Sequence, residues 1–154
     1  MIGALRKLFF LTPAVGIAAV FFAATPALAA ISPVSISNAQ FVAKGVEVDL
    51  TVTFTCTAGD TVGIDPFSFY GPGVTATVQQ AVTKTQQASG FAQLGFGGTC
   101  TGSPQSIVMQ VVAGSGGPPF RVGPAVASVN VLDCDPTGTC VSSSSGLVTV
   151  RISK

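Results

Sequence analysis

Cysteine is the residue type with the clearest chemistry in this sequence. The chain has four, Cys56, Cys100, Cys134 and Cys140. In an exported chain an even number predicts disulfides, and four cysteines allow three connectivities. Cys56 and Cys100 each end a strand-like segment on its apolar side, so we expect them to form one bridge in the core. Cys134 and Cys140 bracket a short polar loop whose ends must lie close together, which predicts the second bridge.

Zinc binding is the alternative use of these cysteines. The spacing of Cys134 and Cys140 is not that of a zinc knuckle, and the chain contains no histidine. We therefore favour disulfides and expect neither a metal nor a cofactor.

Ser115 is the one candidate nucleophile with a suggestive context. The run 113–117 (AGSGG) resembles the nucleophile elbow of hydrolases, which needs a strand before it and a helix after it. Pro118 and Pro119 follow instead, and there is no histidine to act as a base. Lys44 or Lys84 could formally serve as the base, but nothing in the sequence places either one nearby. We interpret the run as a flexible loop.

Two pairs of acidic residues have spacings that could support catalysis or metal binding. Glu47 and Asp49 lie two apart on a predicted strand, among threonines, so we expect a solvated face and not a glycosidase site. Asp133 and Asp135 flank Cys134 and could bind calcium, but they lack the calcium-loop pattern and a completing glutamate. Turn formation before Pro136 is the simpler explanation.

Aromatic side chains near Gly- and Pro-rich loops are the candidates for recognition. Phe67 and Phe69 alternate as core residues would, whereas Tyr70 precedes the turn 71–73 and Phe120 follows the loop 114–119. Loops carried by a rigid scaffold often hold binding residues. We expect Tyr70, Phe120 and Arg121 to be exposed contact residues.

Alternation of apolar and polar residues identifies the elements that carry these side chains. Every even position from Val46 to Cys56 is apolar, which predicts a half-buried strand. A weaker strand precedes it at 34–42. Further strands are expected near 61–70, 74–83, 91–100, 106–113, 125–133 and 147–152, with turns between them. The segment 79–89 could be loop, strand or short helix. Seven or eight short strands predict an antiparallel, immunoglobulin-like β-sandwich.

The N-terminal segment resembles a secretory signal peptide. Arg6 and Lys7 precede an apolar stretch from Leu8 to Ala24, and small residues then form an A-x-A site ending at Ala29. We expect residues 1–29 to be removed and 30–154 to form one secreted domain with no later membrane attachment. An uncleaved membrane anchor is the alternative, which Pro13, Gly16 and the cleavage site argue against.

The charge content excludes whole classes of function. Charged residues make up 8% of the chain, against about 25% in a typical soluble domain. Seven basic and six acidic residues give a net charge of +1, which cannot neutralise a run of phosphates. We therefore expect no nucleic-acid partner.

Three phrases resemble small secreted actinobacterial proteins with immunoglobulin-like β-domains of unknown function. They are 55–60 (TCTAGD), 98–105 (GTCTGSPQ) and 119–125 (PFRVGPA), and the likeness covers most of 46–133. The chain is more loosely similar to neocarzinostatin-type apoproteins, from which its 56-to-100 cysteine spacing departs. The resemblance implies an immunoglobulin-like fold but transfers no activity.

Together these patterns lead us to expect a non-enzymatic secreted domain that binds an unidentified extracellular or cell-envelope partner. An extracellular carrier of a small hydrophobic ligand is the alternative. A hydrolase is a remote third possibility.

Overall fold

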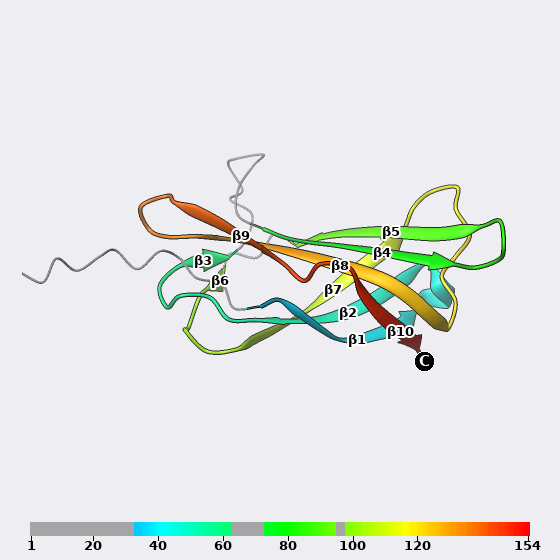
Figure 1. Cartoon of the computed structure of the whole chain (residues 1–154), viewed down its shortest axis with the longest axis horizontal. Helices are drawn as coiled ribbons and strands as arrows, with labels where there is room; N and C mark the ends of the chain where they lie inside the picture. Colours follow the sequence, from blue (N-terminus) through cyan, green and yellow to red (C-terminus); the bar gives the residue numbers. More distant parts are fainter. Residues whose placement is uncertain (1–32, 63–72, 95–97) are drawn as a thin grey trace, which may run out of the picture.

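The computed structural model describes residues 33–62, 73–94 and 98–154 as an all-β domain (Figure 1). Within these three ranges, one 3-10 turn, η1 (Ala43–Gly45), accompanies ten strands. The strands are β1 (Ser35–Val42), β2 (Glu47–Phe54), β3 (Thr61–Val62), β4 (Val74–Ala81), β5 (Gln87–Leu94), β6 (Gly98–Thr99), β7 (Gln105–Ala113), β8 (Gly123–Cys134), β9 (Cys140–Ser144) and β10 (Val148–Ser153). Among the described residues, no helix could cross a bilayer.

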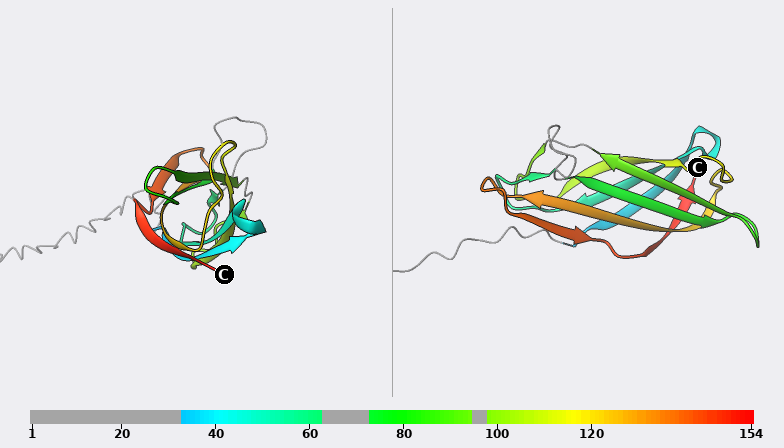
Figure 2. Two further views of the ribbon diagram at one scale, coloured as in Figure 1. Left: turned by 90° about the vertical axis from the view of Figure 1, so that its right-hand side faces the viewer. Right: turned by 90° about the horizontal axis from the view of Figure 1, so that it is seen from above.

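The main sheet closes on itself. Its strands follow the order β10, β1, β2, β7, β5, β4 and β8, and β10 also pairs with β8. The end-on view in Figure 2 shows the resulting ring. The all-β prediction is confirmed, but the predicted sandwich of two separate sheets is not what forms. The prediction of a purely antiparallel sheet is also wrong, because β1 and β10 run parallel, with Ala39 opposite Ile152.

Strand β2 fills the interior as its alternation predicts. Val48, Leu50 and Val52 are completely buried, since they occupy the inward positions of the pleat. Val46 belongs to the same sequence pattern but is 54% exposed. Val46 follows a turn in which Ala43, Lys44 and Gly45 all have positive φ. It precedes β2, which begins at Glu47, and so its side chain is not held in the alternating pattern of the strand.

Two hairpins resolve segments that the sequence left open or misassigned. The segment 79–89 comprises the end of β4, a turn in which Val82 N donates to Gln86 O, and the start of β5. Only turns were expected between the predicted strands 125–133 and 147–152, yet Cys140–Ser144 is strand β9, paired with β8. The Cys134–Cys140 loop is therefore the tip of a β-hairpin, whose two strands are paired from Cys134–Cys140 to Asn130–Ser144.

Several sequence predictions lie outside the described residues. They include the signal peptide at 1–29, the larger part of the predicted strand 61–70, and Phe67, Phe69 and Tyr70. The predicted strand 91–100 is divided between β5, which begins earlier at Gln87, and β6.

Candidate functional site

Both predicted disulfides are confirmed. Cys56 is bonded to Cys100 and Cys134 to Cys140, with Cα–Cα distances of 5.6 Å and 4.1 Å. The first bridge lies in the core, because both of its cysteines are buried. The second closes the tip of the β8–β9 hairpin, where Cys134 and Cys140 are register partners. The two bridges fasten the same end of the domain, which also contains β3 and β6.

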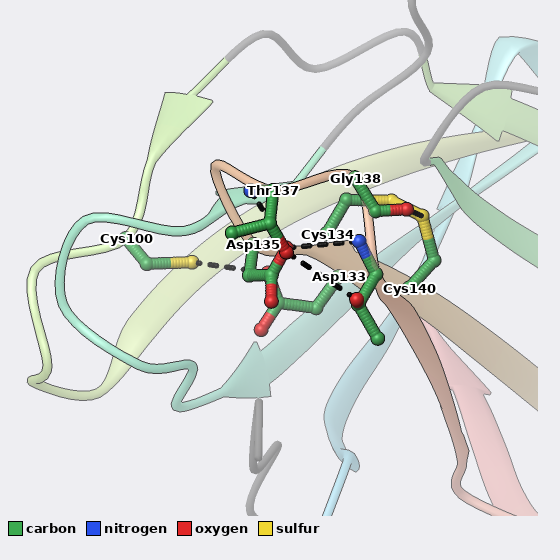
Figure 3. The surroundings of a disulfide bond; sticks show 8 residues. Cys100, Asp133, Cys134, Asp135, Thr137, Gly138 and Cys140 are labelled. Atoms are coloured by element: carbon green, nitrogen blue, oxygen red, sulfur yellow. Dashed lines mark hydrogen bonds between the residues drawn. A yellow bond between two sulfur atoms is a disulfide. The ribbon is translucent and has the colours of Figure 1, made fainter. Parts of the chain in front are cut away.

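Asp135 caps the small disulfide loop with a single carboxylate oxygen. Its Oδ1 accepts hydrogen bonds from Thr137 N at 2.8 Å, Thr137 Oγ1 at 2.7 Å and Thr139 N at 2.8 Å (Figure 3). The hydrogen bond from the Thr137 hydroxyl, followed by that from Thr139 N, lowers the pKa of Asp135. This oxygen stabilises the loop itself, as the turn interpretation of Asp135 anticipated.

A pair of carboxyl groups is buried beside the larger disulfide. Asp133 on β8 is fully buried, and Asp60, just before β3, is 5% exposed. Burial, then the charge of Asp60 and a hydrogen bond with it, raises the pKa of Asp133 to about 6. Asp60 Oδ2 and Asp133 Oδ2 are both inaccessible and have no hydrogen-bond partner among the described residues. One proton held between the two groups would satisfy both oxygens.

The larger disulfide contacts this acid pair. Cys100 Sγ lies 3.7 Å from Asp133 Oδ1 (Figure 3). Because a disulfide sulfur carries no hydrogen, any hydrogen bond along this contact must come from a protonated Asp133. The sulfurs of Cys56 and Cys100 and an Asp133 oxygen lie within 4.8 Å of one another. The sulfurs are bonded together and are not thiolates, so this cluster lacks the ligands that a soft metal needs.

The second carboxylate pair is more enclosed than the sequence predicted. Glu47 and Asp49 point outward from β2 but are half-buried. Burial, followed by the hydrogen bond and the charge of Asp49, raises the pKa of Glu47. Asp49 Oδ1 is inaccessible and has no hydrogen-bond partner among the described residues. Two acidic groups therefore crowd the outer face of β2 beside β7.

Of the two predicted contact residues that the structure describes, Phe120 and Arg121, only Arg121 is exposed. Phe120 is 1% exposed, so the expectation of a surface aromatic at this position is wrong. Its ring packs against Gly90, where an added Cβ would lie 2.9 Å from Phe120 Cζ, and Phe120 N donates to Gly45 O at 2.8 Å. Arg121 is exposed, as expected. Tyr70 lies outside the described residues.

Ser115 lies at an exposed turn and not at a strand-to-helix elbow. Residues 114–117 follow β7 and lead to Pro118 without an intervening helix. Gly117 N donates to Gly114 O across the turn at 3.3 Å, and Gly116 has positive φ. The loop interpretation agrees with this geometry.

Sequence reasoning missed a groove where β5 and β7 separate. The two strands are paired at Gly90–Ala113 and Phe91–Val112 only, and they diverge beyond that point (Figure 1). The groove has a volume of about 270 Å³ and is lined by Ala92–Leu94 of β5 and Val108–Gln110 of β7.

Exposed apolar side chains surround this β5–β7 groove. Phe91 is 53%, Val108 53% and Val112 49% exposed, and these three residues form what we call the outer apolar patch. The inward side of β7 is apolar too, with Met109 and Val111 buried. A strand that is apolar on both faces is the one sequence signal that could have revealed the patch, and the run Ile107–Val112 carries it.

No protein-family model, curated protein or solved structure matches this chain.

Proposed function

We propose that this protein is an exported, non-catalytic binding domain that engages an extracellular or cell-envelope partner through the outer surface around β5 and β7. The observation that carries the proposal is the outer apolar patch beside the β5–β7 groove. Half-exposed apolar side chains clustered on two neighbouring strands are typical of interaction sites.

Export is supported by the resemblance of residues 1–29 to a signal peptide and by the two disulfides. Disulfides persist in oxidising compartments outside the cytosol. A non-catalytic role is supported by the nature of the reactive groups. The chain has no histidine, and all four cysteines are in disulfide bonds.

The interior gives less support to a carrier of small hydrophobic ligands. The centre of the closed sheet is packed with side chains that are at most 1% exposed, among them Leu50, Phe54, Met109 and Val129. The groove, at about 270 Å³, lies just below the usual size of small-molecule pockets, which is roughly 300–1,000 Å³. We also propose, on the resemblance of its sequence, that the domain is related to immunoglobulin-like domains.

Crosslinking in the native host tests the proposed function. The full chain and its Phe91→Ser/Val112→Ser variant are expressed with a purification tag, and extracellular complexes are crosslinked and purified. We expect a discrete complex with the wild type that is lost in the variant. Leu147→Ser is the matched control, since Leu147 is 83% exposed but precedes β10, so its complex should persist. A complex that survives the double substitution, or a hydrolytic turnover abolished by Ser115→Ala, would contradict the proposal.

A further inference from the structure

Among the residues that the structure describes, the backbone on both sides of the β5–β7 groove is left unpaired. In an antiparallel ladder, hydrogen-bonded pairs alternate with non-hydrogen-bonded pairs. Gly114 N donates to Ser89 O at 2.8 Å, so Ser89–Gly114 is a hydrogen-bonded pair. Two residues further along, Phe91–Val112 is the next such pair, and it is the last one formed within the described part of β5, which ends at Leu94.

The next hydrogen-bonding positions therefore face the groove. Continuing the register would pair Gln93 with Gln110, and both residues line the groove. On the opposite edge, β7 is paired with β2. Ala113 N donates to Val46 O, and hydrogen-bonding positions alternate, so the odd-numbered residues of β7 bond to β2. The N–H and C=O groups of Gln110 and Val108 consequently point away from β2 and into the groove.

Side chains at the groove divide into two faces. Ala92 and Met109 point inward and are buried, whereas Phe91, Val108 and Val112 form the outer apolar patch. A strand lying in the groove would place alternate side chains on each of these faces. Small apolar residues suit the inner face, where the free volume is small.

The charged side chains of β2 beside the groove are both acidic. Glu47 and Asp49 lie directly opposite Val112 and Gln110 across the β2–β7 ladder. The pKa of Glu47 is raised by burial and by Asp49, with no contribution from a basic side chain. Asp49 also keeps a buried oxygen without a hydrogen-bond partner among the described residues. A basic group on an incoming partner would complement this pair.

We propose that the β5–β7 groove is a strand-addition site: an extended, basic and apolar peptide segment of another protein pairs with the free edge of β7. Main-chain hydrogen bonds to Val108 and Gln110 supply affinity, and alternate apolar side chains cover the outer apolar patch. A Lys or Arg of the segment lies toward Glu47 and Asp49. This inference rests on the proposed function and names its partner class.

A defined peptide tests strand addition directly. The probe is fluorescently labelled, blocked Lys-Ala-Val-Ala-Val-Ala-Lys, in which the lysines and valines share the outer face and the small alanines face inward. Its matched control carries N-methyl groups on residues 3, 4 and 5, so that neither edge of its centre can donate a hydrogen bond. Fluorescence polarisation with the full chain should give binding in the micromolar range, weakened at least 10-fold by N-methylation. Raising the salt from about 50 to 500 mM should weaken binding severalfold, and less so for Glu47→Gln/Asp49→Asn.

Two substitutions at one position separate backbone from side chain. Gln110→Pro removes an N–H that faces the groove and not the β2 ladder, so it should weaken binding at least 10-fold. Gln110→Ala removes the same side chain but keeps the N–H, so it should weaken binding far less than Gln110→Pro does. If Gln110→Pro does not fold, N-methylation of the peptide decides the question on the wild-type protein.

The outcomes distinguish this inference from the proposed function. Equal affinity for the N-methylated peptide, or no binding at about 1 mM peptide, overturns strand addition. In either case, a crosslinked complex that depends on Phe91 and Val112 still supports a binding domain that uses its side-chain surface. If neither peptide binding nor a crosslinked complex that depends on Phe91 and Val112 is found, both proposals are overturned.

Discussion

The carboxyl groups of Asp60 and Asp133 are buried next to each other, where β8 meets the segment entering β3. The strand register explains the contact. Val62 of β3 lies opposite Asp133 of β8, and Asp60 precedes Val62 by two residues on the same face, so Asp60 is the diagonal neighbour of Asp133. Each carboxyl group keeps one inaccessible oxygen without a hydrogen-bond partner among the described residues. One proton shared by the two carboxyl groups gives both of these oxygens a hydrogen-bond partner. If both groups are ionised, their like charges repel each other in the interior.

The first prediction is that the acid pair makes the domain more stable at mildly acidic pH. The pKa of Asp133 is raised from 3.8 to about 6 by burial and by Asp60. A raised pKa in the folded state contributes stability that is full below pH 3.8 and is lost as pH rises through about 6. The contribution is at most about 3 kcal/mol, since each pKa unit corresponds to about 1.4 kcal/mol. Urea unfolding at pH 5 and pH 8 measures the difference.

Asp133→Asn should reduce this pH dependence, because the amide can still donate to Asp60 but does not titrate. Asp135→Asn is the control with the opposite sign. The lowered pKa of Asp135 contributes stability above its unfolded value that is lost as pH falls, so this variant should be destabilised at neutral pH. If the free energy of unfolding of Asp133→Asn changes between pH 5 and pH 8 as much as that of the wild type, the shared-proton interpretation is refuted.

The second prediction concerns the unequal weight of the two disulfides. Cys56–Cys100 closes a loop of 44 residues and Cys134–Cys140 a loop of 6. The chain-entropy estimate gives about 4 kcal/mol for the larger loop and about 2 kcal/mol for the smaller. Replacing both cysteines of each bridge by alanine should lower the free energy of unfolding in that order. Equal losses would show that packing around the bridges outweighs loop closure.

Alternation made local structure predictable from sequence. The inward set of β2 followed directly from the even positions between Val48 and Cys56, and both disulfides followed from the faces and loops of their cysteines. Period-2 patterning fixes which side chains enter the core, because a shift of one residue would expose the whole set.

Closure of the sheet and the position of the groove were not predictable in the same way. β10 pairs with both β8 and β1, and nothing in its alternation specifies two partners. The groove depends on β5 and β7 separating after Phe91–Val112, which is a property of pairing between strands distant in sequence. Phe120 was misassigned because proximity to a loop does not report burial. Its backbone bond to Gly45 holds it against the core.

The third prediction is a large effect of truncating Phe120. Its side chain is 1% exposed and packs against Gly90. Phe120→Ala should lower the free energy of unfolding by about 3–5 kcal/mol, which combines lost burial with the cavity left behind. Phe91→Ala is the matched aromatic control, because Phe91 is 53% exposed, and it should cost less than about 1 kcal/mol. Chemical denaturation of both variants measures the difference, and similar losses would contradict the burial of Phe120.

The fourth prediction concerns Gln80, a buried amide that joins the end of β4 to the segment entering β8. Its Nε2 donates to Arg121 O at 2.8 Å and to Pro124 O at 3.3 Å, and its Oε1 accepts from Arg121 N at 2.7 Å. Gln80→Met keeps the length of the side chain but leaves these backbone groups unpaired, so it should cost about 1–3 kcal/mol.

Gln80→Glu should be destabilised more at neutral pH than at acidic pH, because an ionised carboxylate would face two carbonyl oxygens and could not donate to either. On protonation one donor returns, so part of the lost stability should be recovered as the pH is lowered. Gln79 lies next to Gln80 on β4 but is exposed, so Gln79→Met and Gln79→Glu provide matched controls with changes within about 0.5 kcal/mol. Denaturant unfolding of the four variants at pH 5 and pH 8 measures both effects. If Gln80→Glu is as stable as the wild type at pH 8, Gln80 does not hold this segment through its amide donor.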